Sequence, residues 1–141
     1  MLTSPARDPA IMVRTTDAAL LADEYFQIKH HGDVAVVIPS PEVEQLPESL
    51  MQPAASMLLA PLKDDPPSHV IVDLAGVRYF GSAFITLLLR LHQICKSQGS
   101  ELILSGVNSR VRELLNTTAL DTLWALYETR QEALDALGGS D

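Results

Sequence analysis

Apolar residues first form a regular pattern at Tyr25. The stretch YFQIK, residues 25–29, alternates apolar and polar side chains, and the polar turn HHGD follows it. The next run, VAVVIP at residues 34–39, is apolar almost throughout. Two extended runs separated by a short turn that contains Gly32 and Asp33 predict a β-hairpin.

The segment from Ser40 to Leu62 has apolar residues at roughly helical spacing. Pro47 and Pro53 interrupt this spacing, and proline removes a backbone donor inside a helix. We therefore expect a helix that starts late or is kinked. The polar stretch LKDDPPS, residues 62–68, is expected to form a loop.

The middle of the chain contains its clearest strand and its clearest helix. HVIVDL, from His69 to Leu74, is apolar with little interruption, which is typical of a central strand covered on both faces. After a loop, a helix is predicted from Ser82 to about Gln98, and Gly99 ends it. The apolar stripe of this helix comprises Phe84, Leu87, Leu88, Leu91, Ile94 and Cys95.

The rest of the chain continues to alternate strands with helices. ELILSG, residues 101–106, predicts a buried strand, and LWALYE, residues 123–128, predicts a short last strand. NSRVRELLNTTAL predicts a one-sided helix with Asn108 and Ser109 as cap candidates, and TRQEALDAL predicts a last helix. This order indicates an α/β fold: a mostly parallel sheet of four to five strands that begins with a β-hairpin, with about four helices.

One domain accounts for most of the chain. Residues 25–137 form the predicted domain, whose size suits a single hydrophobic core. Residues 1–24 hold prolines and polar residues without a clear period, so we expect a loosely ordered N-terminal extension. Residues 138–141 begin with two glycines and are expected to form a flexible tail.

The charge of the chain restricts its partners. It has 18 acidic residues against 10 lysines and arginines, which gives a formal net charge of −8. Such a surface repels the phosphates of nucleic acids and of anionic membranes. A protein partner with a basic patch is the contact that the overall charge favours.

The sequence has no motif for catalysis or for binding a metal or cofactor. The single cysteine, Cys95, cannot form an internal disulfide, and no zinc-ligand spacing accompanies it, which favours a cytoplasmic protein. We expect no signal peptide, and no apolar run is long enough to cross a membrane. Phosphate-binding glycine motifs and a nucleophile elbow are absent from the sequence, so we expect neither an enzyme nor a bound cofactor.

Ser82 stands where the clearest helix begins, and two roles are open to it. Its hydroxyl can accept a hydrogen bond from a backbone N–H of the first turn, as a helix cap, while Gly81 can supply a positive φ for a tight entry turn. A phosphate on Ser82 would instead lie against the positive end of the helix dipole and add about −1.5 to −2 charge. The position by itself favours the cap.

The residues around this serine are candidates for contact with a protein partner. Arginine and aromatic residues dominate the binding energy of protein interfaces, which makes Arg78, Tyr79 and Phe84 candidates. Gly81 and Ala83 flank the serine and complete the set. The alternative is that the aromatic side chains, Phe84 above all, belong to the core.

Asp73 is the acidic residue inside the clearest strand. It lies near the carboxyl end of that strand, close to the loop that holds Gly81. A buried carboxylate needs hydrogen bonds, so we expect Asp73 to accept them from loop N–H groups and to organise the loop. A catalytic role is not expected.

From about Phe26 to Leu137 the sequence resembles the STAS domain, named for sulfate transporters and anti-sigma factor antagonists. The resemblance comes from the order of short motifs: a strand ending in Asp-Leu, a V-x-F/Y loop, a serine opening a long helix, and a later xVRxLL helix. The matching positions are Asp73-Leu74, Val77 to Phe80, Ser82, Gly99, Leu102 to Leu104, Val111 to Leu115 and Leu120-Asp121.

The resemblance implies a STAS fold and a regulatory role in signal transduction and transcription. In the family, the serine of an Asp-Ser pair is phosphorylated by a kinase that is also the anti-sigma factor, and the phosphate releases the domain from that kinase. Ser82 matches this serine and is the implied phosphate acceptor. Gly81 replaces the aspartate, and Phe84 replaces a glycine of the family's Asp-Ser-Ser-Gly.

Two other functions remain open at this point. The domain is a constitutive scaffold in which Ser82 is never phosphorylated, or it senses a nucleotide or lipid in a cleft near the same loop. The sequence also leaves a homodimer open.

Overall fold

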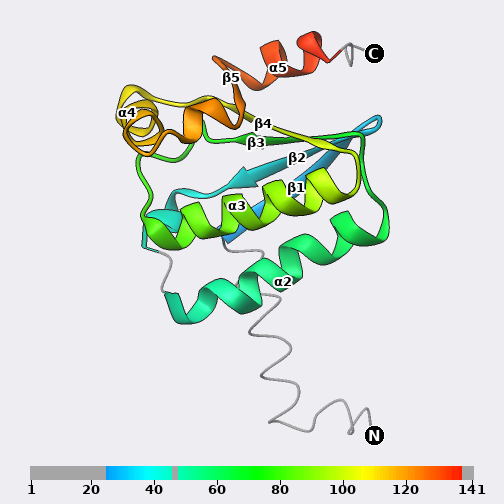
Figure 1. The fold of residues 1–141 in the computed structure, drawn as a ribbon, viewed down its shortest axis with the longest axis horizontal. Helices are drawn as coiled ribbons and strands as arrows, with labels where there is room; N and C mark the ends of the chain where they lie inside the picture. Colours follow the sequence, from blue (N-terminus) through cyan, green and yellow to red (C-terminus); the bar gives the residue numbers. More distant parts are fainter. Residues whose placement is uncertain (1–24, 46–47, 138–141) are drawn as a thin grey trace, which may run out of the picture.

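Five strands form one sheet in a computed structural model that describes residues 25–45 and 48–137 (Figure 1). The sheet order follows the chain, β1-β2-β3-β4-β5, with β1 antiparallel to β2 and the other neighbours parallel. The predicted fold class is confirmed, while the predicted N-terminal extension and tail lie outside the described residues. The strands are β1 (Phe26–His31), β2 (Val34–Pro39), β3 (His69–Asp73), β4 (Glu101–Ser105) and β5 (Ala125–Tyr127).

Four α-helices and two short 3-10 helices connect and follow the strands within the described ranges. The α-helices are α2 (Glu48–Asp64), α3 (Ser82–Ser97), α4 (Ser109–Thr117) and α5 (Arg130–Ala136), and the 3-10 helices are η2 (Pro41–Gln45) and η3 (Leu120–Thr122). The late start predicted for the helix between Ser40 and Leu62 is confirmed, since α2 begins at Glu48. α2 also continues into the segment predicted to be a loop, because the Asp65 amide still donates to the Pro61 carbonyl at 3.1 Å.

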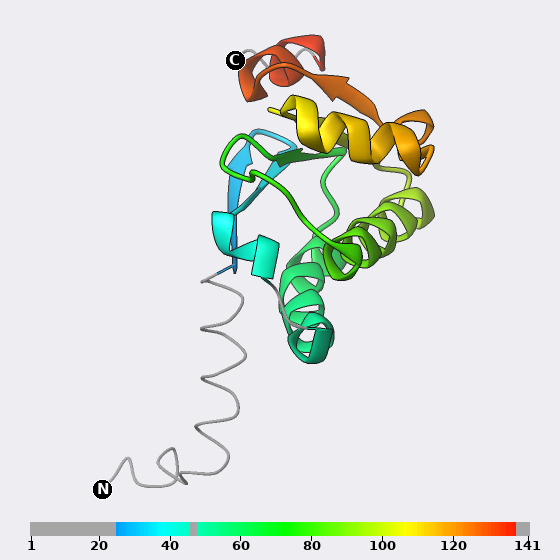
Figure 2. The same ribbon diagram turned by 90° about the vertical axis from the view of Figure 1, so that its left-hand side faces the viewer.

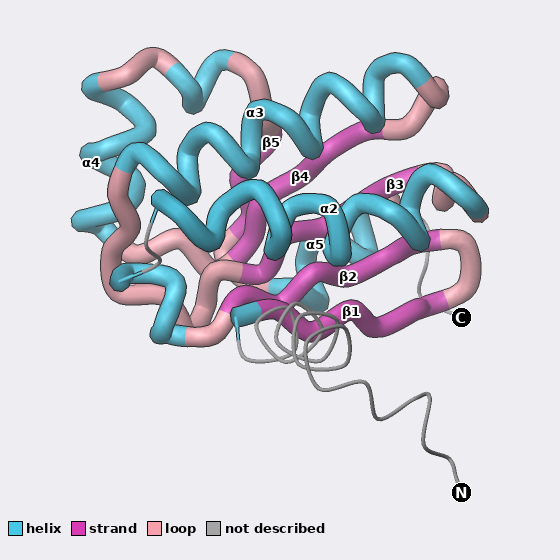
Figure 3. Tube along the Cα trace, turned by 90° about the horizontal axis from the view of Figure 1, so that it is seen from below, coloured by secondary structure: helices cyan, strands magenta, loops and turns pink. Residues whose placement is uncertain are grey.

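The helices cover the two faces of the sheet unequally. α2 and α3 lie side by side on one face, and α5 lies on the other (Figures 1 and 2). Seen from below, α2 and α3 lie over the sheet and run roughly along its strands (Figure 3). The continuous apolar run of β3 serves both layers: Val70 and Val72 belong to the core under α2 and α3, whereas Ile71 packs with Leu134 of α5.

Three glycines of the described ranges, Gly32, Gly99 and Gly106, have a left-handed backbone, and the first two make tight connections. Gly32, with a φ of +62°, makes the two-residue hairpin turn that pairs His31 with Val34. Gly99, with a φ of +76°, ends α3 as predicted, and the next amide, that of Ser100, donates back to the Cys95 carbonyl at 2.7 Å.

Candidate functional site

The loop from Leu74 to Gly81 leaves the carboxyl end of β3 and enters α3. Its side chains divide between core and solvent. Val77 and Phe80 are buried, whereas Arg78 is exposed and Tyr79 is half-buried. Since the buried pair holds the loop against the core, the residues between and after it are presented at the surface.

Ser82 is the first residue of α3 and is exposed. The N-cap position belongs to Gly81, and no side chain caps the helix there. The hydroxyl of Ser82 makes no hydrogen bond within the described part of the chain, although its carbonyl accepts one from Thr86 Oγ1 at 3.0 Å. The helix-cap prediction for Ser82 is therefore wrong, because the serine lies one residue inside the helix.

Gly81 also differs from its prediction. Its φ is −107° and its ψ is −163°, which is the extended conformation usual for an N-cap and open to any residue. A Cβ atom placed on it would meet nothing within 4 Å. The predicted positive φ is wrong, and a larger side chain fits at this exposed position.

Phe84 lies in the core, which corrects its assignment as a partner contact. It is 1% exposed, and its ring stacks on Phe26 with 6.2 Å between centroids and tilts against Phe80 at 4.8 Å. The reason is its place on the apolar stripe of α3, which faces the sheet. Ala83 is half-buried beside it.

Arg78 and Tyr79 are the loop side chains that reach the surface. Arg78 Nη2 lies 3.5 Å from Glu44 Oε1 in η2, and its side chain is 82% exposed, so this ion pair contributes little to stability. The Tyr79 ring lies under the guanidinium of Arg110 from α4, with 4.4 Å from Cζ to the ring centroid. Arg110 was not among the predicted site residues.

Asn108 joins the loop to α4. Its Oδ1 accepts from the Val111 amide at 2.7 Å, which confirms it as the helix cap. Its Nδ2 donates to the carbonyls of Val77 and Arg78 at 3.2 and 3.1 Å. The cap was predictable from the residue type, but these loop contacts were not, because nothing local indicates which carbonyls lie within reach.

Asp73 is 5% exposed at the end of β3. One carboxylate oxygen accepts from the Ala75 amide at 3.2 Å and from Ser105 Oγ at 3.3 Å. The other accepts from Arg130 Nε at 2.9 Å, which ties α5 to the sheet. The hydrogen bond from the loop amide is of the kind predicted, whereas the arginine from α5 was not predicted.

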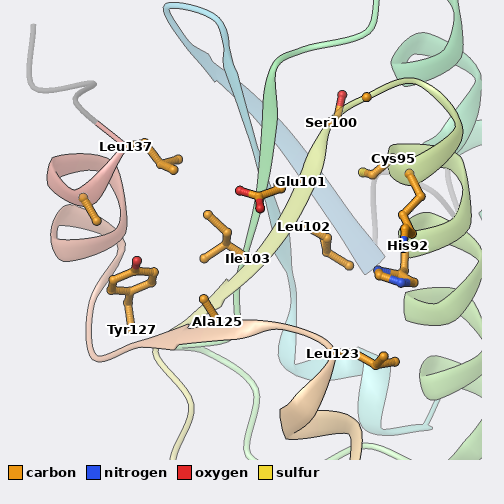
Figure 4. Close-up of a pocket in the computed structure, with 13 residues that line it drawn as sticks. His92, Cys95, Ser100, Glu101, Leu102, Ile103, Leu123, Ala125, Tyr127 and Leu137 are labelled. Atoms are coloured by element: carbon orange, nitrogen blue, oxygen red, sulfur yellow. The ribbon is translucent and has the colours of Figure 1, made fainter.

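A recess of about 590 Å³ lies at the opposite end of α3, where β4 begins (Figure 4). His92 and Cys95 of α3 line one side, and β5 and the end of α5 line the other. Trp124 Nε1 donates to His92 Nδ1 at 3.0 Å, so the hydrogen of the neutral imidazole is on Nε2. Burial raises the pKa of the Cys95 thiol to about 11.

The described residues contain neither a metal-binding cluster nor a membrane-spanning helix. No group of three or more His, Cys, Asp or Glu side chains among them could hold a metal ion. No helix in these ranges is both long enough and apolar enough to cross a lipid bilayer.

The sequence profile of the STAS domain matches residues 52–133, which is more than half of the chain. The chain belongs to the STAS domain family. An anti-sigma-factor antagonist (STAS) domain protein from Planctomyces limnophilus is 34% identical to it; the match covers 80% of this chain and 97% of that one, with a TM-score of 0.70. The predicted resemblance is confirmed.

Solved structures of lower identity share the fold. An anti-sigma factor antagonist from Mycobacterium paratuberculosis is 23% identical over 79% of this chain and 91% of that one, with a TM-score of 0.63. The anti-sigma factor antagonist SpoIIAA, in its unphosphorylated form, is 16% identical over 82% and 98%, with a TM-score of 0.69. The STAS architecture is therefore retained at low identity.

Proposed function

We propose that this STAS domain binds a protein partner through the loop before α3, and that phosphorylation of Ser82 releases the partner. The observation that supports this most directly is the exposed, unbonded hydroxyl of Ser82 at the first residue of α3, next to Arg78 and Tyr79 on the same loop. Similarity to anti-sigma factor antagonists supports a serine kinase of the anti-sigma type as the partner. The chain then acts in cytoplasmic signalling and transcription regulation, without catalysis of its own.

The start of α3 suits an added phosphate. The first N–H groups of a helix have no carbonyl partner within it, and the helix dipole places partial positive charge there. The first turn of α3 contains no acidic residue that would repel the new charge. The phosphate would add about −1.5 to −2 charge at the contact surface, so partner affinity is expected to fall while the fold remains stable.

Incubation with ATP and the anti-sigma-type serine kinases of the same genome tests the acceptor. Mass spectrometry is expected to find one phosphate, on Ser82, and none on the Ser82→Ala variant. Ser109→Ala is the matched control, because Ser109 is also exposed and is the first residue of its helix, α4. Phosphate on other sites only, or on none with any of these kinases, would overturn the switch and support the constitutive scaffold.

The missing family aspartate can be tested in the same assay. Gly81→Asp restores the Asp-Ser pair, and the open space around Gly81 accommodates the side chain. If the kinase recognises the acid, the rate of phosphorylation rises in this variant. An unchanged rate would show that recognition depends on other parts of the loop.

The recess at the start of β4 favours a second candidate, a small-molecule sensor. Its volume of about 590 Å³ is in the range of ligand pockets. The sequence predicted a cleft near the loop before Ser82. This recess instead lies at the other end of α3. A thermal-shift screen with nucleotides and fatty acids checks this function, because a ligand of the native state raises the melting temperature.

A further inference from the structure

Next to the loop, α4 carries an arginine with no acidic partner in the described ranges, residues 25–45 and 48–137. The guanidinium of Arg110 lies over the ring of Tyr79, and none of the ion pairs in these ranges includes it. Stacking on an aromatic face leaves the N–H groups along the edge of the guanidinium available as donors. The surface therefore presents an oriented cation, supported from below by a half-buried tyrosine.

The stability of α4 does not explain this arginine. Arg110 is the second residue of the helix, where the positive end of the helix dipole repels a cation. The first turn of α4 contains no acidic residue that would offset the repulsion. The helix dipole therefore gives no reason for a cation at this position, and the chain as a whole is acidic, with a net charge of −8.

A shallow recess lies beside this cation. It measures about 320 Å³ and is lined by Tyr79, Arg110, Glu113, Leu114 and Thr117. The hydrogen bonds from Asn108 to the loop carbonyls hold the loop against α4. Because Tyr79 belongs to the loop and also lines the recess, the recess and the cation adjoin the loop that leads to Ser82.

We propose that the partner places an aspartate or glutamate side chain of a protein segment against the edge of Arg110, with neighbouring residues of that segment in the recess. A carboxylate matches the guanidinium through two parallel hydrogen bonds. This rests on the proposed function, in that the loop is the partner-binding surface, and adds the chemistry of the partner. The overall charge favoured a basic partner, whereas the free edge of the Arg110 guanidinium favours a carboxylate. Glu113 also lines the recess, so the acidic group of the segment is expected at Arg110 and its uncharged neighbours in the recess.

This contact also gives the release step a physical cause. The loop before α3 leads directly to Ser82, so a charge added to Ser82 changes the electrostatic potential at a partner bound to this loop. A phosphate on Ser82 would add negative charge next to the loop that carries Tyr79, which disfavours an acidic segment bound at the Tyr79–Arg110 pair.

Site-specific photo-cross-linking tests the proposal even while the partner is unidentified. The cross-linking amino acid benzoylphenylalanine replaces Gly81 in the full chain, expressed in its native host, because the space around Gly81 is open. The cross-linked partner peptide, identified by mass spectrometry, is expected to contain aspartate or glutamate. A cross-linked segment without acidic residues, or no adduct above the level without irradiation, would overturn the proposal.

Charge reversal supplies the quantitative test. With the purified partner, Arg110→Glu is expected to weaken binding about tenfold or more, and replacement of the cross-linked partner acid by lysine is expected to restore it. Arg112→Glu is the matched control, because Arg112 is exposed on the same helix but does not line the recess; its effect should stay within about twofold. Equal effects of the two reversals, or no rescue, would contradict the contact.

The outcomes separate this inference from the proposed function. If the cross-linked partner is no kinase but its binding depends on Arg110, the acidic contact stands and the anti-sigma assignment fails. If a kinase phosphorylates Ser82 but binds Arg110→Glu like the unmodified chain, the switch stands and the acidic contact fails. Circular dichroism of each variant checks that the fold is retained.

Discussion

Single residues at the carboxyl end of β3 illustrate how burial and polarity are reconciled. Asp73 is buried, and three donors from the loop, β4 and α5 satisfy its carboxylate. The crowding also requires a glycine: a Cβ on Gly106, whose φ is +70°, would lie 2.9 Å from Asp73 Oδ1. The Arg130 side chain is 37% exposed, so its removal would leave the buried carboxylate of Asp73 with two of its three donors, the Ala75 amide and the Ser105 hydroxyl.

At Phe84, the helical spacing and the preference of protein interfaces for aromatic residues gave different expectations. Its helical spacing predicted the core, and its place beside Ser82 predicted a partner contact. The structure buries it against Phe26 and Phe80. A buried phenylalanine contributes about 3–5 kcal/mol relative to alanine, so packing decides the position.

Cys95 gives a prediction for the pH dependence of stability. Burial raises the pKa of its thiol from 9.0 to about 11. Between these two pH values the unfolded chain loses the thiol proton while the folded chain keeps it, so rising pH favours unfolding. The stabilisation that the raised pKa represents is therefore fully present below pH 9 and is lost as pH rises through 11. Cys95→Ala lacks this contribution. The stability difference between unmodified chain and variant should therefore shrink by about 2 kcal/mol from pH 8 to pH 11.

Urea unfolding of both proteins across this pH range measures the difference. All other ionisable groups are common to both proteins, so their contributions cancel in the comparison. A stability difference that stays constant from pH 8 to pH 11 would contradict the prediction.

At the scale of elements, the start of α4 combines local and tertiary roles. Its sequence, Asn108 before SRVRELL, predicted the cap from residue type alone. The same side chain also holds the loop through its amide group. One residue therefore stabilises a helix and positions the candidate binding surface.

Two substitutions of Asn108 separate these roles. Asn108→Asp keeps the oxygen that caps α4 but loses the donors to the Val77 and Arg78 carbonyls, so we expect faster amide exchange in residues 77–82 with the cap retained. Asn108→Ala loses both the cap and the two donors. Its free energy of unfolding should be about 1 kcal/mol lower than that of Asn108→Asp, because the cap of α4 is missing. Hydrogen exchange and thermal unfolding measure the two effects. Loop exchange in Asn108→Asp equal to that of the unmodified chain would show that the tether does not order the loop.

At the scale of the whole molecule, the two faces of the sheet are stabilised to different extents. The core under α2 and α3 contains most of the buried apolar residues, whereas the core under α5 contains Val34, Val36, Ile71, Ile103, Ala133 and Leu134. α5 has seven residues and is joined to the sheet by this small core and by the Arg130–Asp73 pair. We expect α5 to detach more readily than α3.

Matched leucine truncations test this difference. Leu134→Ala in α5 and Leu88→Ala in α3 remove the same side chain from positions that are 3% and 1% exposed. Leu134→Ala is expected to increase amide exchange mainly in α5, by local opening, while Leu88→Ala lowers global stability by about 2–5 kcal/mol. If exchange in α3 and α5 rises together in Leu134→Ala, the two layers unfold as one unit.

The sequence by itself determined the kinds of elements, their order and the buried stripe of α3. These features depend on side-chain spacing within one strand or helix, which is local. Only the tertiary structure decided which residues share an environment. Asp73 and Arg130 are 57 positions apart in the sequence, and Asn108 is 30 positions from Arg78, whose carbonyl it contacts. These contacts form because parallel strands need long crossovers, which bring distant segments of the chain together. The same crossovers place Arg110 on Tyr79, and no periodicity along the chain encodes that contact.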